Sequence, residues 1–153
     1  MQATVSTKQA STEAVTRGLA DLMRHLLVTT GRDFFAEMEK AGVSLTHTKS
    51  LMLLSDADEP MSVKAISDAL GLSLPGVSRS IDGLVQRGEL KREEDPRDRR
   101  CKLVSITPKG RRLYERLVEV RLAGVRRFVD ELNENEKEGL AYGLDAVAGR
   151  IPR

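Results

Sequence analysis

The chain has 153 residues, of which 40% are apolar, so it is long enough for one domain with a core of its own. Its formal net charge is only +2, so the chain as a whole is neither strongly basic nor strongly acidic. Its single cysteine, Cys101, excludes an intrachain disulfide. The polar N-terminus lacks an apolar signal-peptide run, and no segment has the about 18–20 apolar residues of a membrane span. These features are typical of a cytoplasmic protein that does not enter a membrane.

Positive charge is concentrated in residues 97–112. This segment holds seven of the 25 lysines and arginines but one of the 23 acidic residues, so the rest of the chain has a net charge of −4. A local positive field on an acidic body suits a surface that binds phosphate. Charge alone leaves the alternative of an ordinary solvated face.

The first predicted element is a long amphipathic helix over residues 12–40. The side chains of one face recur at intervals of three and four residues, and they are Val15, Leu19, Leu22, Met23, Leu26, Leu27, Thr30 and Phe34. Gly42 indicates the end of this helix. A second helix is predicted from Thr46 to about Ser55, with Leu51 and Leu54 facing inward, and a polar turn follows it.

Two short helices joined by three residues come next and predict a helix-turn-helix. The first covers residues 63–70, with Ser62 as N-cap and Gly71 ending it in the left-handed conformation. Its predicted inward positions are Ala65, Ile66, Ala69 and Leu70. The second covers residues 74–87, with Ser73 as cap and Pro75 in the first turn. Its inward residues are Val77, Ile81 and Leu84, and Gly88 ends it.

An arginine-rich segment, Asp95-Pro96-Arg97-Asp98-Arg99-Arg100-Cys101-Lys102, precedes the β-like run 103–107 and is interpreted as the tip of a β-hairpin wing. Thr107 and Pro108 then begin a helix over residues 108–131. Asn133 and Glu136 form a capping box for a last helix. The long terminal helices carry apolar stripes with no obvious partner, so we expect them to pair with a second copy of the chain.

This order of elements resembles the MarR (multiple antibiotic resistance regulator) family over roughly residues 12–150. The most specific segments are residues 65–73, Val77-Ser78-Arg79, and Asp95–Arg100 followed by Leu103–Gly110. The resemblance implies a mainly α fold with a small β-wing, namely a winged helix-turn-helix. It implies a single MarR-like domain over 1–153, with dimerisation helices at 12–40 and 108–151 and a DNA-binding module at 46–107. It also implies a homodimeric regulator, usually a repressor, that binds a pseudo-palindromic operator in double-stranded DNA and is released by a small ligand or by oxidation.

The candidate DNA-binding residues lie on the second helix of the helix-turn-helix and on the wing. They are Ser73, Pro75, Gly76, Ser78, Arg79, Arg97, Arg99, Arg100 and Lys102. The family pattern places DNA contacts at Ser78 and Arg79, and an arginine can pair with guanine O6 and N7. Neither Pro75 nor Gly76 reads bases by hydrogen bonding, so we expect a large contribution from DNA shape.

Within the wing, Arg97 matches the arginine that the family inserts into the minor groove, where the negative potential is strongest. Asp95 and Asp98 are expected to hold neighbouring arginines, because carboxylates repel phosphate. Arg99 and Arg100 could take either role. Lys91, Arg92 and Lys102 are weaker candidates for phosphate contacts.

Other chemistry has little support in the sequence. Nothing resembles a nucleophile–base pair or a phosphate-cradling loop, and the two histidines lie apart, so we expect no enzyme, cofactor or metal site. An effector pocket would be mostly aliphatic, with Met23, His25, Phe34 and Phe35 as its candidate lining.

Two alternatives to a ligand-released repressor remain. One is an adaptor of the same fold without operator binding. The other is a redox-sensing regulator in which cations around Cys101 lower the pKa of its thiol.

Overall fold

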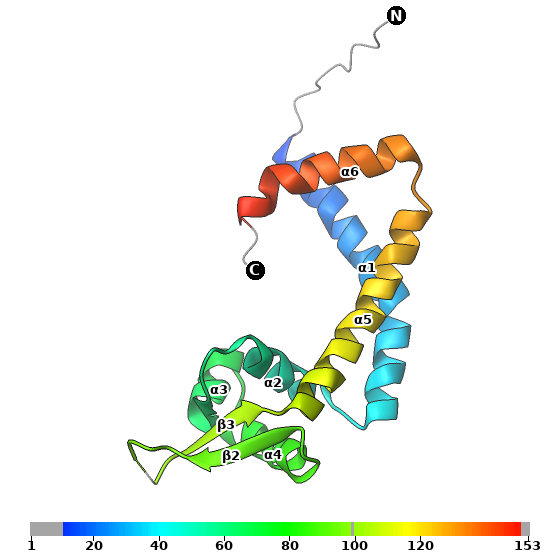
Figure 1. The fold of residues 1–153 in the computed structure, drawn as a ribbon. Helices are drawn as coiled ribbons and strands as arrows, with labels where there is room; N and C mark the ends of the chain where they lie inside the picture. Colours follow the sequence, from blue (N-terminus) through cyan, green and yellow to red (C-terminus); the bar gives the residue numbers. More distant parts are fainter. Residues whose placement is uncertain (1–10, 99, 151–153) are drawn as a thin grey trace, which may run out of the picture. The chain divides into compact units, whose positions relative to one another are not determined.

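The computed structural model describes residues 11–98 and 100–150 (Figure 1), so Arg99 lies outside the described residues. The chain divides into two compact units. Residues 33–122 form the winged unit, and the described residues 11–32 and 123–150 form the helical unit. The helices are α1 (Thr12–Ala41), α2 (Leu45–Asp56), α3 (Val63–Leu70), α4 (Leu74–Gln86), α5 (Pro108–Asp130), α6 (Glu134–Val147) and the short 3-10 helix η1 (Ala148–Arg150). The strands are β1 (Met61–Ser62), β2 (Leu90–Glu94) and β3 (Lys102–Ile106).

The helix ends follow local capping chemistry and confirm the predicted boundaries to within one or two residues. The Ser62 hydroxyl accepts from Ala65 N at the start of α3, and Gly71 ends that helix at φ 62°. The capping box of Asn133 and Glu136 is present at α6. One predicted cap is wrong. Ser73 stands at the N-cap of α4, but its hydroxyl makes no capping hydrogen bond.

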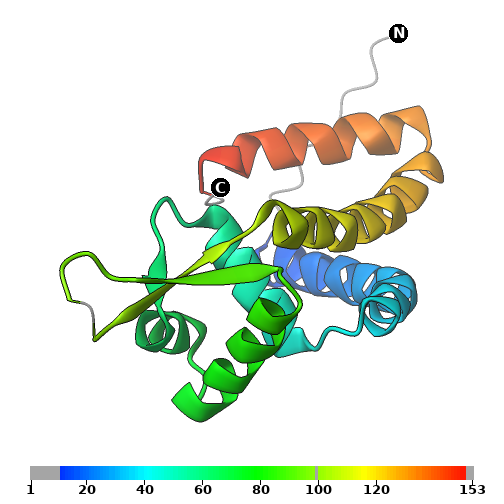
Figure 2. The ribbon, with the colours of Figure 1, turned by 60° about the horizontal axis from the view of Figure 1, so that its bottom comes forward.

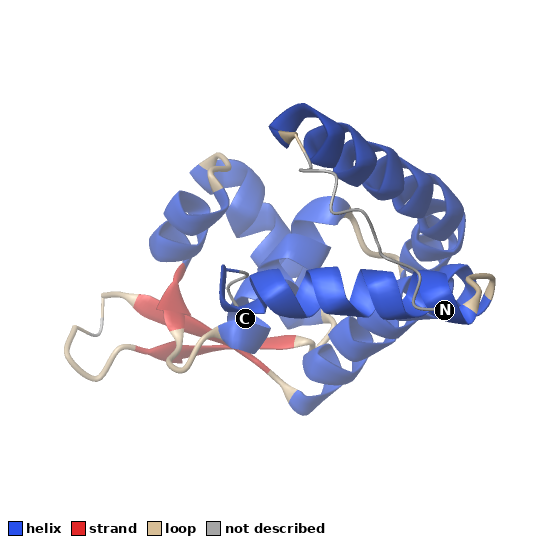
Figure 3. Ribbon diagram, turned by 90° about the horizontal axis from the view of Figure 1, so that it is seen from above, coloured by secondary structure: helices blue, strands red, loops and turns tan. Residues whose placement is uncertain are grey.

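The three strands form one antiparallel sheet in the order β1-β3-β2 (Figure 3). In the hairpin, Leu90 pairs with Ile106, Arg92 with Val104 and Glu94 with Lys102. The predicted wing is therefore a hairpin. The two-residue β1, which pairs Met61 with Val104, extends the sheet on the other side of β3 and was not predicted from the sequence.

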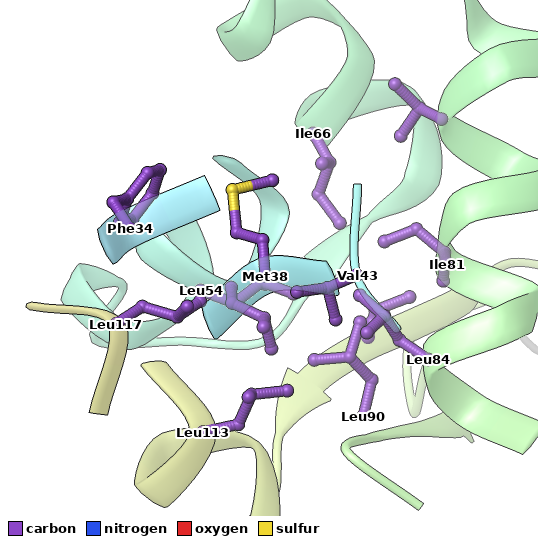
Figure 4. Packing of buried hydrophobic residues seen from close by; sticks show 13 residues of the cluster. Phe34, Met38, Val43, Leu54, Ile66, Ile81, Leu84, Leu90, Leu113 and Leu117 are labelled. Atoms are coloured by element: carbon purple, nitrogen blue, oxygen red, sulfur yellow. The ribbon is translucent and has the colours of Figure 1, made fainter. Parts of the chain in front are cut away.

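The hydrophobic core lies in the winged unit. Its buried side chains are Phe34, Met38, Val43, Leu51, Leu54, Ile66, Val77, Ile81, Leu84, Leu90, Val104, Leu113 and Leu117, and Figure 4 shows them converging from the helices and the sheet. The predicted inward residues of α4 are fully buried. Ala69 of α3 is exposed, contrary to the prediction, whereas Ser67 is buried because its hydroxyl donates to Leu72 O over 2.6 Å.

The helical unit has no comparable core among its described residues. The α1 and α5 backbones approach closely at Gly124, where an added Cβ would overlap the Thr30 side chain. The rings of His25 and Phe128 are in contact at a tilted angle of 54°, with centroids 5.4 Å apart. The larger apolar side chains are exposed instead, and they are Val15, Leu19, Met23, Leu27, Val28, Val125, Tyr142, Leu144 and Val147.

Candidate nucleic-acid interface

The outward face of α4 is fixed by what its inward face buries. Val77, Ile81 and Leu84 have no exposed surface and Ser80 is also buried, so the opposite face of α4, which carries Ser78, Arg79 and Asp82, is turned away from the core. Arg79 is exposed and Ser78 is half-buried. The Arg79 guanidinium makes no hydrogen bond or ion pair with the described residues, so its donors are available to a ligand.

The start of α4 presents few polar groups. Pro75 is exposed in the first turn. A Cβ added at Gly76 would lie 3.0 Å from the Ser73 hydroxyl oxygen, so the glycine allows a close approach between the turn and the helix. Because the Ser73 hydroxyl does not cap α4, it can donate to an external acceptor.

The hairpin lies beside α4 within the winged unit (Figure 2). Two aspartates brace its tip. The Asp95 carboxylate accepts from Arg97 N over 2.8 Å, and the Asp98 carboxylate accepts from Arg100 N over 3.0 Å. These bonds hold the backbone rather than the guanidinium groups, which refines the expectation that the aspartates pair with arginines. Within the described chain, the exposed side chains of Arg97 and Arg100 therefore have no ion-pair partner.

Lys102 is engaged inside the hairpin. Its Nζ lies 2.9 Å from Glu94 Oε1 on the paired strand, and this bond lowers the pKa of the Glu94 carboxyl. Both side chains are exposed, so the pair is weakly held in water. Lys102 can therefore reach a phosphate only by leaving Glu94.

Arg92, one of the weaker phosphate candidates, pairs with an acid on α4. Its Nη1 lies 2.5 Å from Asp82 Oδ1. The sequence carries no signal for this pair, because the two residues are ten positions apart on elements of different periodicity. The neighbouring Lys91 pairs with Glu93 on its own strand.

A second group of polar contacts joins the end of α4 to the rest of the winged unit. Arg87 forms an ion pair with the buried Glu89 and donates to the Gly42 carbonyl over 2.6 Å. Lys109 donates to the Arg87 carbonyl, and Thr107 donates to the carbonyls of Gly88 and Glu89. These contacts fix the turn that leads into the wing.

His47 lies close to this turn. Its Nδ1 accepts from Ser44 N over 3.0 Å and completes a capping box at α2. Burial, and then the positive charge of Arg87, lower the pKa of His47. Sequence reasoning treated this histidine as isolated, because the partners come from other elements.

The four predicted ligand-binding residues do not come together in one described cavity. Phe34 lines a cleft of about 280 Å³ in the winged unit, whereas Phe35 is 55% exposed and does not line it. Met23 and His25 belong to the helical unit, where Met23 is 60% exposed and His25 makes a tilted ring contact with Phe128. The other residues that line the cleft are Leu45, Thr48, Lys49, Met52, Tyr114, Leu117, Val118 and Arg121.

This cleft is apolar with a few polar groups at its wall. The Arg121 guanidinium lies 3.9 Å from the centre of the Phe34 ring, a cation–π contact. Lys49 and the Tyr114 hydroxyl add polar groups, and burial raises the pKa of Tyr114. These residues carry no joint signal in the sequence, because they come from α2 and α5, which only the fold brings beside Phe34.

Cys101 does not have the surroundings that a reactive thiol needs. It is exposed, and its Sγ lies 3.6 Å from the Asp98 carboxylate. The negative charge of Asp98, the hydrogen bond to it and the charge of Asp95 raise the pKa of the thiol. The alternative in which nearby cations lower this pKa is therefore not supported, because the charge of Asp98 has the largest influence on the thiol and raises its pKa.

The described residues contain no group of three or more histidine, cysteine, aspartate or glutamate side chains that could hold a metal ion. None of the helices that the structure describes has both the length and the apolar character to cross a membrane.

Known proteins share this fold. Residues 41–100 match the family model described as MarR family. The chain is 27% identical, over 127 residues, to the uncharacterised HTH-type transcriptional regulator YfiV of Bacillus subtilis (strain 168); the match covers 83% of this chain and 79% of that protein. The structure of RV1404 from Mycobacterium tuberculosis matches with a TM-score of 0.76 and 23% identity over 97% of this chain and 99% of that one.

The S. aureus MepR–DNA complex matches with a TM-score of 0.70 and 20% identity over 87% of this chain and 99% of that one. At these identities the two structures show a common fold. The fold is mainly α, with a small three-stranded antiparallel sheet, as expected from the sequence.

Proposed function

We propose that this chain, which belongs to the MarR family of DNA-binding transcriptional regulators, acts as a homodimeric repressor on a pseudo-palindromic operator. The observation that carries this proposal is the pair of exposed cations on one rigidly packed unit. Arg79 on α4 and Arg97 on the wing both present guanidinium groups that no described residue neutralises. Other cations of the winged unit, such as Arg87, Arg92 and Lys102, are engaged in internal ion pairs, whereas these two lie on the helix and the wing that the proposal brings to DNA.

In this proposal α4 enters the major groove and the wing tip enters the adjacent minor groove. Arg79 donates to the O6 and N7 atoms of a guanine, and Arg97 lies in the narrow minor groove. The hydroxyls of Ser73 and Ser78 donate to phosphate or to a base edge. Pro75 contacts a thymine methyl, and Gly76 lets the helix start approach the DNA backbone.

The wing cations around Arg97 add phosphate contacts. Arg100 is exposed at the tip, and Lys102 can contribute on leaving Glu94. Arg99 is proposed for the same role from its sequence position alone. Because each phosphate contact releases counterions, binding should weaken steeply as salt is raised.

The helical unit supplies the dimer. Its exposed side chains include Leu19 and Leu27 of α1 and Tyr142 and Leu144 of α6, an apolar surface that a second copy would cover. Two reading heads of a dimer bind half-sites about one helical turn, or about 34–36 Å, apart. The structure of S. aureus MepR in complex with DNA supports DNA binding by the shared fold.

The cleft beside Phe34 is the proposed effector site. A mostly apolar cleft of about 280 Å³ with Lys49 and Arg121 in its wall suits a small amphipathic molecule. Such a molecule releases DNA only if it binds more tightly to a conformation whose reading heads do not match the operator.

The test begins with a pool of random-sequence DNA duplexes. The duplex that the protein enriches from this pool then serves as its operator. The full chain is used to enrich duplexes, and the affinity of the selected duplex is measured against salt concentration. We expect an inverted-repeat sequence and a linear fall of log affinity with log salt. Arg79→Ala should relax the preference at a guanine of each half-site, whereas exposed Lys64→Ala on α3 should leave the preference unchanged.

A chain that enriches no sequence would refute the proposal and favour the adaptor of the same fold. The redox alternative is tested on the same duplex with peroxide. Because Asp98 raises the pKa of the Cys101 thiol, we expect Cys101→Ser and the unchanged chain to respond alike.

A further inference from the structure

The ion pair between α4 and the wing stands on the surface proposed to meet DNA. Asp82 follows Ser78 by four residues and Arg79 by three, so the three side chains share one face of α4. Arg92 comes from β2, where it pairs with Val104 of β3. The ion pair joins Arg92 Nη1 to Asp82 Oδ1, and the Arg92 side chain is only 29% exposed.

Considered separately, each member of this pair has a cost: Asp82 disfavours DNA binding, and Arg92 disfavours folding. A carboxylate at position 82 repels the phosphates that Arg79 attracts. The Arg92 Nε is buried and has no hydrogen-bond partner among the described residues, which destabilises the fold. Because the Nε of Arg92 is unsatisfied, the position of the Arg92 side chain depends on the bond that its Nη1 makes with Asp82.

Beyond its first residue, β2 has little else to hold it against α4. Leu90 is the only buried residue of this strand, and Arg92 is the only other one that is not exposed. Lys91, Glu93 and Glu94 face solvent. Val104 of β3, opposite Arg92, anchors the hairpin in the core, and the contact between Arg92 and Asp82 is the ion pair that ties the outer part of β2 directly to α4.

We propose that Asp82 and Arg92 are positioning residues that fix the wing relative to α4, so that Arg97 reaches the minor groove while Arg79 lies in the major groove. This inference rests on the DNA-binding mode proposed above. Neither residue needs to contact a base. Asp82 acts through Arg92, and Arg92 acts through the hairpin that carries Arg97.

The sign of the effect at Asp82 tests the proposal. Simple electrostatics predicts that Asp82→Asn strengthens DNA binding, because the change removes a negative charge beside the phosphates. The positioning role predicts the opposite, a loss of about fivefold in affinity for the selected duplex. Glu93→Gln is the matched control, since it removes a carboxylate that pairs with Lys91 one residue along the wing from Arg92. This control should bind as tightly as the unchanged chain or slightly more tightly.

A double-mutant cycle with Arg97 separates positioning from a general loss of structure. If Asp82 acts through the wing, Asp82→Asn should cost clearly less once Arg97→Ala has removed the minor-groove contact, because only the phosphate contacts of the other wing cations are then left to lose. Hydroxyl-radical footprints should show Asp82→Asn losing protection in the minor groove, while protection of guanine N7 from methylation by dimethyl sulfate, which reports the major-groove contact of Arg79, persists. Thermal unfolding of each variant identifies any that are not folded, and for those Arg92→Lys replaces the Asp82 change in the cycle.

Tighter binding by Asp82→Asn, or a loss that adds fully to that of Arg97→Ala, would overturn the positioning role while leaving the proposed function intact. Failure of the unchanged chain to select any duplex would overturn both. These outcomes are distinguishable because the selection is carried out before any variant is made.

Discussion

The two units of the chain treat their apolar residues in opposite ways. All the buried hydrophobic side chains among the described residues lie in the winged unit, from Phe34 to Leu117. In the helical unit the buried positions are Thr30 and Gly124, while Leu19 is 61% exposed and Tyr142 is 81% exposed. Both units use amphipathic helices, so the difference lies in what covers the apolar face.

This contrast indicates a division of work. The winged unit buries its own core and can hold α4 and the wing in a fixed relation without help. The helical unit exposes a large apolar surface, which is costly in water unless a partner removes it. Folding of the winged unit and formation of the proposed dimer should therefore respond to different substitutions.

The largest expected effect comes from making the helical unit unable to pair. Leu19→Glu combined with Leu144→Glu should convert the dimer to a monomer, because charged groups replace side chains proposed to be buried between copies. Operator affinity should fall by about a hundredfold or more, since one reading head binds without the effective concentration that the second provides. Sedimentation equilibrium gives the mass, and a gel shift gives the affinity.

Leu45→Glu is the matched control for this prediction. Leu45 is 52% exposed, but it belongs to the winged unit. The control should keep the mass of the unchanged chain. Equal masses for the double variant and the unchanged chain would show that the exposed stripe does not form the interface.

The next effect concerns the packing of the winged unit. A Cβ at Gly110, in the first turn of α5, would overlap the carbonyl group of Glu89. Backbone cannot move aside as a flexible side chain can, so Gly110→Ala should lower the free energy of unfolding by about 2 kcal/mol. Urea unfolding followed by circular dichroism measures this change.

Gly139→Ala on α6 provides the opposite case. Nothing lies within 4 Å of a Cβ added there, so alanine should stabilise the helix by about 0.5–1 kcal/mol. Similar effects of the two substitutions would contradict the view that the winged unit is closely packed and the helical unit open.

The sequence was sufficient for the local features of both units. Ser62, Gly71, Thr107 and Asn133 mark helix ends through interactions within a few residues, and periodicity identified Val77, Ile81 and Leu84 as buried. These features depend on short-range chemistry, and for that reason they can be read from sequence.

Long-range side-chain partners could not be predicted in the same way. The pairs of Arg92 with Asp82 and of Arg87 with Glu89 require knowing where the hairpin lies on the helices. Phe34 was expected in an effector pocket, but its neighbours Lys49, Tyr114 and Arg121 come from segments that only the fold brings together. The Asp98 carboxylate could equally have paired with an arginine, and its contact with Cys101 depends on the turn geometry of the tip.

A substitution on the proposed DNA-binding surface should have an intermediate effect on operator affinity. Arg97→Ala should weaken operator binding by about tenfold, equivalent to about 1.4 kcal/mol, because a minor-groove cation is lost. Arg116→Ala is the control, since it removes the same charge from α5, where Arg116 faces Glu37 at 3.7 Å. A gel shift at physiological salt compares the two, and equal affinities would remove Arg97 from the minor groove.

The smallest expected effect is a pH dependence of the unfolding free energy that arises in the winged unit. Because burial and Arg87 hold the pKa of His47 below 6.5 in the folded chain, the unfolded chain binds the proton more readily. The stabilisation from neutral His47 is therefore fully present above about pH 6.5, falls as the pH drops toward the folded pKa, and levels off below it. Protonation at Nδ1 would also remove the acceptor for Ser44 N at the start of α2.

His47→Gln should therefore flatten the dependence of the unfolding free energy on pH below about pH 6.5. Urea unfolding at several pH values measures the slope for both chains. Because His47 lies in the winged unit, the same difference should remain in the monomeric Leu19→Glu, Leu144→Glu background. A slope that is unchanged by His47→Gln would show that other groups control the response to acid. A slope that disappears with the dimer would place the response in the helical unit instead.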